Sequence, residues 1–204
     1  YGAHSRDLVK SFLADDKYDV KILDVPWGDC PRNALDENNT VDKEILNLIQ
    51  PEPLHLDRQP DVYVDIRIPN EFQTWGKYNI GITAGVETTA VSAKWLECCN
   101  KMDLIIVPSE HSKAGFVSSV YDKLQQLPDG KQQKVGTFKL EKPIEVLFEG
   151  ADEDIYKPLT KDEIDSDFWV NGQKVVMVKI EKIWVELLKC FIKLLQIKRN
   201  NLLL

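Results

Sequence analysis

Apolar and polar positions between Tyr1 and Gly150 fall into two kinds of spacing, and turn residues separate the segments. Helical spacing follows three residues that can cap a helix, Ser5, Thr40 and Ser92. The predicted helices run from Arg6 to Ala14, from Val41 to Ile49 before Pro51, and from Ser92 to about Met102. A longer fourth helix is predicted from Ser109 to about Leu127.

Short apolar runs lie between these helices and predict strands. They are Tyr18–Val25, Asp61–Ile68, Asn79–Thr83, Leu104–Val107 and Ile144–Phe148. The runs at 80–82 and 104–107 carry no polar residue, which is typical of parallel strands that are covered on both faces. Strands alternating with helices predict an α/β domain, built as a Rossmann-like open parallel sheet with helices on both faces.

Ligands bind to such sheets beyond the carboxyl ends of the strands. Five segments follow a predicted strand and carry polar or acidic residues: Pro26–Cys30, Pro69–Phe72, Gly85–Thr89, Ser109–Lys113 and Glu149–Asp152. Position alone therefore predicts a site built from these loops, before any chemistry is assigned to it.

Composition narrows the class of protein. The chain has 204 residues, 43% hydrophobic and 29% charged, which suits one large globular domain or one domain with part of a second. Its net charge of −7 and pI near 5.1 argue against a nucleic-acid partner held through phosphates. Nothing in the first half has the pattern of a signal peptide or a membrane span. Because the sequence opens at Tyr1 in what reads as a loop, an upstream element is expected before it.

The four cysteines and three histidines lack the spacing of a zinc or redox motif. Cys98 and Cys99 are adjacent, and neighbouring cysteines seldom bridge each other because the geometry is strained. Buried reduced thiols are therefore expected, which suits a cytoplasmic protein. Neither a metal nor a cofactor is expected.

Four motifs are more specific. Asn79-Ile-Gly-Ile-Thr-Ala-Gly-Val-Glu-Thr-Thr is followed by Trp95-Leu-Glu-Cys-Cys-Asn-Lys-Met-Asp-Leu-Ile-Ile-Val-Pro-Ser-Glu-His-Ser-Lys. With the turn Phe148-Glu-Gly-Ala-Asp-Glu-Asp-Ile-Tyr-Lys-Pro and the helix start His4-Ser-Arg-Asp, the chain resembles the GT-B glycosyltransferases of the cell-wall and lipopolysaccharide type. The resemblance extends over roughly Tyr1 to Val170 and depends on the order and spacing of these motifs.

The resemblance implies transfer of a sugar from a nucleotide-sugar donor to a hydroxyl acceptor, usually without a bound metal and mostly with retention of configuration. Residues 1–159 would be the acceptor-side domain, the N-terminal half of a GT-B fold without its first strand. Residues 160–173 would be a linker and the start of the donor domain. Positioning, and stabilisation of the departing phosphate, would then supply most of the rate.

Under this interpretation Glu87 is the candidate catalytic residue, a carboxylate that orients or deprotonates an acceptor hydroxyl. The residues predicted to bind the acceptor are His4, Trp27, Asn70, Glu71, Thr88, Ser109 and Lys113. Simpler explanations stay open: a solvated loop acid for Glu87, a turn for Asn70 and Glu71, a helix cap for Ser109, a solvated amine for Lys113 and a packing anchor for Trp27. Trp95 and Tyr121 are expected to be core residues on helices.

The stretch 174–204 differs from the rest because it contains no Gly, Pro, Asp, Ser, Thr or Ala. Apolar residues from Ile180 to Leu195 fall at helical spacing with lysines between them, which predicts a basic amphipathic helix suited to a membrane surface. A second interpretation is a frameshift shortly after Gly172, because a shifted frame permits the charged, glycine-rich segment that the family has there. The tail would then be out of frame, the donor domain would be absent, and the isolated chain would be inactive.

Two other functions stay open. One is a non-catalytic α/β module that binds a glycan or a protein. The other is a subunit held at the inner face of the membrane by its tail, which liposome co-sedimentation with and without residues 174–204 would test.

Overall fold

The computed structural model describes residues 1–15, 17–25, 28–29, 33–51, 55–84, 89–128 and 130–150, and the backbone of short strands at 169–170, 173–174 and 202–203. The helices are α1 (Gly2–Asp15), α2 (Thr40–Leu48), α3 (Ala93–Cys99) and α4 (Glu110–Ser118), with a 3-10 turn, η1 (Pro69–Glu71). The strands are β1 (Val20–Lys21), β2 (Val62–Ile66), β3 (Tyr78–Ile82), β4 (Leu104–Val107), β5 (Tyr121–Gln126), β6 (Gln132–Phe138), β7 (Ile144–Val146), β8 (Trp169–Val170), β9 (Gln173–Lys174) and β10 (Leu202–Leu203).

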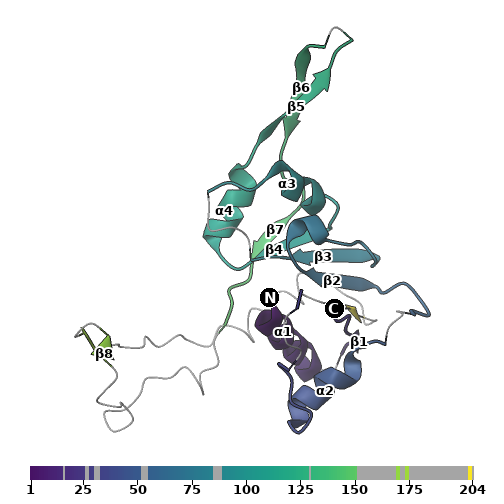
Figure 1. Cartoon of the computed structure of the whole chain (residues 1–204). Helices are drawn as coiled ribbons and strands as arrows, with labels where there is room; N and C mark the ends of the chain where they lie inside the picture. The colour runs from purple at the N-terminus through teal and green to yellow at the C-terminus, as the bar shows by residue number, and fades with distance from the viewer. Residues whose placement is uncertain are drawn as a thin grey trace.

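The centre of the molecule is a parallel sheet in which β2, β3, β4 and β7 are neighbours in that order. The two-residue strands β1 and β10 extend it on the β2 side, also in parallel. In Figure 1, α1 and α2 lie below this sheet, and α3 and α4 lie above it. The predicted α/β architecture, a parallel sheet with helices on both faces, is therefore confirmed.

Alternate residues of the strands form two separate cores. Ile106 and its neighbours pack with Leu8 and Phe12 of α1 on one face of the sheet. Ile105 packs on the other face with residues of α3 and α4, among them Leu96 and Phe116. This is why β4 is apolar at every position: each side chain is buried, and successive side chains point to opposite faces.

Most predicted elements occur, with different ends. Strand β4 has the predicted bounds, and Ser92 caps α3 by accepting a hydrogen bond from the Trp95 backbone N–H. Asn39, rather than Thr40, caps α2. The predicted strand at 18–25 is reduced to β1 and a single bridge between Ile22 and Ile49.

The long helix predicted from Ser109 to Leu127 is wrong. Helix α4 ends at Ser118, and the chain continues into an antiparallel hairpin of β5 and β6. Gly130, with φ of 81°, lies in the turn that joins them, a conformation that glycine adopts without strain. Tyr121 accordingly begins a strand instead of lying on a helix, although it does pack against the α3–α4 core, as Trp95 does.

No helix within the described ranges is long and apolar enough to cross a membrane. The predicted tail helix, at 180–195, lies outside the described residues. So do the residues 151–168, which include most of the predicted closing turn and the start of the linker.

Candidate functional site

The carboxyl ends of β2, β3, β4 and β7 form one edge of the sheet, and helices α1 and α4 both begin there. The centre of this edge is Ala84, two residues after β3. Its backbone N–H donates to the Tyr1 hydroxyl at 3.3 Å, and its carbonyl accepts from Ser112 Oγ at 3.1 Å. The Tyr1 hydroxyl also lies 3.2 Å from Thr83 Oγ1. The first turns of two helices are thus joined to the loop after β3.

Ser109 is the cap of α4. Its hydroxyl accepts from the Ser112 backbone N–H at 3.1 Å and lies 3.1 Å from the Ser112 hydroxyl. Ser112 is buried, and its hydroxyl reaches Ala84. Ser109 therefore has the capping role that the sequence left open, and it also belongs to a chain of hydroxyl groups at the carboxyl edge.

His4 lies in the first turn of α1 and meets the last described loop. Its Nδ1 is 3.2 Å from Glu149 Oε1, and the histidine side chain is 8% exposed against 54% for the glutamate. Burial lowers the pKa of His4, although the nearby Glu149 carboxylate acts in the opposite direction. The imidazole is therefore neutral at pH 7 and is oriented by a carboxylate from the loop after β7.

Lys113 lies one turn into α4, and its side chain reaches β7. Its Nζ is 3.4 Å from Glu145 Oε2 on β7, and both side chains are partly exposed. An exposed pair of this kind is weak, so the lysine remains available to a stronger anion.

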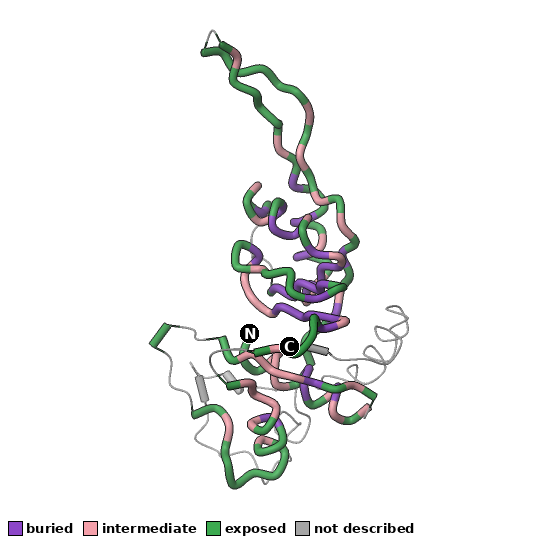
Figure 2. Tube along the Cα trace, turned by 90° about the vertical axis from the view of Figure 1, so that its right-hand side faces the viewer, coloured by how far each residue is buried: buried purple, intermediate pink, exposed green. Residues whose placement is uncertain are grey.

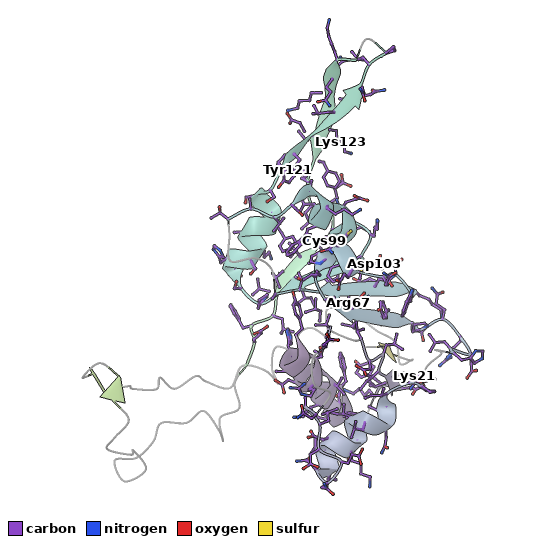
Figure 3. The ribbon with its side chains drawn as sticks, in the orientation of Figure 1. Lys21, Arg67, Cys99, Asp103, Tyr121 and Lys123 are labelled. Carbon is purple, nitrogen blue, oxygen red and sulfur yellow. The ribbon has the colours of Figure 1, made fainter. Side chains whose placement is uncertain are left out.

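Asn70 and Glu71 lie on η1, and both are exposed. The loop that carries them is fixed by an ion pair that was not predicted from the sequence. Asp65 accepts two hydrogen bonds of 2.7 Å from Arg67, and its Oδ2 also accepts from the Gln73 backbone N–H at 2.8 Å. Asp65 is 3% exposed, and its hydrogen bonds to Arg67, labelled in Figure 3, raise the pKa of the guanidinium.

The structure joins Ser109 to Ala84 through Ser112, and it pairs His4, three residues after Tyr1, with Glu149 in the loop after β7. Asn70 and Glu71 lie on η1 after β2, and Lys113 lies on α4. Trp27, Glu87 and Thr88 lie outside the described residues. Ser112 and Glu149 lie in segments that the sequence predicted for the site, but they were not named as site residues. Tyr1, Asp65 and Arg67 were not predicted. The Asp65-x-Arg67 spacing was the available signal for the ion pair, because it puts both side chains on one face of a strand.

Within the described ranges, no three His, Cys, Asp or Glu side chains are grouped so that they could hold a metal ion. Comparison with known proteins found no matching family model, no matching curated protein and no matching solved structure. The resemblance to GT-B glycosyltransferases stays a prediction.

Proposed function

We propose that this chain is the acceptor-side domain of a GT-B type glycosyltransferase, which transfers a sugar from a nucleotide-sugar to a hydroxyl acceptor without a bound metal. The observation that carries the proposal is the convergence on Ala84. Tyr1 before α1, Thr83 after β3 and Ser112 of α4 meet there, at the edge where open α/β sheets bind their ligands.

The polar groups at this edge suit a polyhydroxylated ligand. Tyr1 and Ser109, which are not buried, supply hydroxyls that both donate and accept, and the exposed Glu149 supplies a carboxylate beside the imidazole of His4. Thr83 and Ser112 are buried and hold these groups in place. A sugar or another polyol presents hydroxyls with the same dual character, so such a surface binds it through exchange of hydrogen bonds.

Glu87 is the proposed catalytic residue and follows Ala84 by three positions in the sequence. A carboxylate in this loop would orient the acceptor hydroxyl or accept its proton. His4, neutral at pH 7, has the proposed role of binding an acceptor hydroxyl while Glu149 fixes the orientation of its ring. The donor phosphates would be bound by a second domain.

The test is an NMR titration of the full chain with a panel of neutral oligosaccharides and, separately, with nucleotide-sugars. We expect oligosaccharides to shift the amide signals of Thr83, Ala84 and Ser112, because these residues form the centre of the edge. The amides of Gln125 and Gln133, on the β5–β6 hairpin, are the internal control and should not shift. If no oligosaccharide shifts the edge amides, the proposed acceptor site is wrong.

Sequencing the source DNA across Gly172 separates the enzyme from a non-catalytic binding module. A shifted frame that continues into a second α/β domain, with a basic phosphate clamp and paired acids, favours the enzyme. If the printed frame ends at Leu204 while oligosaccharides bind at the edge, the chain is a glycan-binding module and catalysis by it is refuted.

A further inference from the structure

The β5–β6 hairpin forms an arm that projects away from the body of the molecule (Figures 1 and 2). Its base is anchored. Tyr121 donates a hydrogen bond from its hydroxyl to the Val91 carbonyl, and Tyr121 and Phe138 pack against the α3–α4 core. Beyond this base, all of β5 and most of β6 is exposed. Figure 3 shows Tyr121 at the base and Lys123 further along the arm.

Within the described part of the chain, β5 and β6 form a two-stranded sheet of their own. Two strands with no core beneath them are marginally stable in water. The outer edge of each strand also presents backbone N–H and C=O groups that can pair with another strand. The arm can therefore pair with a further strand along the outer edge of either β5 or β6.

The edge of β6 is protected. Lys123 pairs with Gly136 and Leu124 pairs with Lys134, so Val135 is an extra residue that forms a bulge in β6. Bulges and lysines are two devices by which natural proteins prevent edge pairing. The outer half of β5, in contrast, reads Leu124-Gln125-Gln126, with no charge, proline or bulge.

The pairing register also defines the two faces of the arm. Residues directly opposite each other in an antiparallel pair lie on the same face. Asp122, Leu124 and Gln126 therefore share one face with Lys134, and the 2.6 Å ion pair between Asp122 and Lys134 agrees with this. Leu124 is 56% exposed on this face, with no apolar neighbour opposite it in the hairpin.

We infer that β5 pairs with β5 of a second copy of this chain, antiparallel about a two-fold axis at Leu124, to give a four-stranded sheet. In this register the two Leu124 side chains lie opposite each other. Asp122 lies opposite Gln126 of the other copy, so that the amide donates to the carboxylate. Lys123 lies opposite Gln125 of the other copy, so that the ammonium donates to the amide oxygen.

Other two-fold registers of β5 are less favourable. A register centred on Asp122 opposes two carboxylates, and one centred on Lys123 opposes two ammonium groups, which is destabilising. A register centred on Gln125 brings Pro128 opposite Asp122, and proline cannot donate to a ladder. The register centred on Leu124 alone opposes no like charges, keeps proline out of the ladder and buries the two leucines.

The geometry of the arm permits this pairing. Strand β5 has six residues and is about 20 Å long. Because the paired strands run in opposite directions, the tip of each arm would reach the base of the other, and the two bodies would lie at opposite ends. Both copies use the same surface of β5, and this surface is complementary to itself, as a two-fold interface requires.

The test is sedimentation equilibrium of the full chain from about 1 µM to about 100 µM. We expect a concentration-dependent dimer. Leu124→Glu should weaken it by about tenfold or more, because it places two carboxylates on the axis and removes the apolar contact, whereas within the hairpin the glutamate lies opposite Lys134 and is tolerated. Val135→Glu is the matched control: Val135 is equally exposed, at 55%, but lies on β6, so its dimer should differ by less than about twofold.

Disulfide trapping tests the register. In a Cys30→Ser, Cys190→Ser background, Leu124→Cys should form an interchain disulfide under mild oxidation, because only a residue on the axis faces itself. Val135→Cys should not. A monomer at every concentration, equal weakening by the two glutamate variants, or equal trapping at both positions would each overturn the inference. Far-ultraviolet circular dichroism must first show that the variants are folded.

Discussion

Replacing Asp65 by Asn tests whether the buried ion pair holds the loop that carries Asn70 and Glu71. Asp65 is 3% exposed, and its carboxylate accepts from Arg67 twice and from Gln73 once. The Arg67 side chain is 15% exposed. Asp65→Asn would therefore leave a guanidinium largely desolvated without a counter-charge, and breaking a buried pair in this way costs about 3 kcal/mol.

Urea unfolding, followed by tryptophan fluorescence, measures this cost. With a slope of about 3 kcal/mol per molar urea, the midpoint should fall by about 1 M. The matched control is Glu97→Gln, which breaks ion pairs between exposed side chains and should leave the midpoint nearly unchanged. A double change of Asp65→Asn with Arg67→Met should recover much of the stability, because no buried charge is left.

The same variant should change the loop. Asparagine keeps only one acceptor oxygen and no charge, so the bond to the Gln73 backbone N–H should weaken, and hydrogen exchange at Asn70 and Glu71 should speed up more than at Ile80, which lies within the sheet. If Asp65→Asn moves the urea midpoint no more than Glu97→Gln does, the ion pair is not a stabilising element and the reasoning fails.

Three further predictions follow from single contacts. Gly81→Ala should destabilise the chain by about 1–3 kcal/mol in the same urea assay, because a Cβ there would lie 2.5 Å from Phe72 Cε2; Phe72→Leu should relieve part of the loss. Burial raises the pKa of Cys99 to about 12, so mass spectrometry should find it unalkylated at pH 8 until denaturant is added. Folding lowers the pKa of His4, so the unfolded chain binds the extra proton more tightly. The free energy of unfolding should therefore fall as the pH falls below the ordinary value of 6.5. His4→Gln should reduce this pH dependence in unfolding measured from pH 7 to pH 5.

The sequence predicts well those segments whose apolar pattern fits only one kind of secondary structure. Leu104–Val107 is short, apolar throughout and bounded by Asp103 and Pro108, so only a buried strand fits it. The segment after Ser109 has two patterns. Val117, Val120 and Leu124 fall at helical spacing, but Pro, Asp and Gly in succession from Pro128 are a sequence signal for a turn, which allows a hairpin. Pairing with β6 decides the outcome.

The sequence likewise predicts one property of the candidate site, its location, and not another, its contacts. Its location follows from the rule that parallel strands present their carboxyl ends at one edge, which the sequence already supports. Its contacts do not follow, because Tyr1 with Ala84 and His4 with Glu149 join residues far apart in sequence. The sequence carries no local signal for such pairs, and only the register of the sheet brings them together.

The candidate site and the arm lie at the two ends of α4, so the two proposals can be tested separately. Helix α4 begins at the carboxyl edge with Ser109 and ends before the arm starts at Tyr121. The arm returns through Lys139, whose carbonyl accepts from Asn100 at the end of α3, and the chain then enters β7 at its amino end. Leu124→Glu should therefore weaken the dimer and leave the oligosaccharide shifts at Ala84 unchanged. If it also abolishes those shifts, the second copy contributes to the site, and the acceptor surface must be sought between two chains rather than on one.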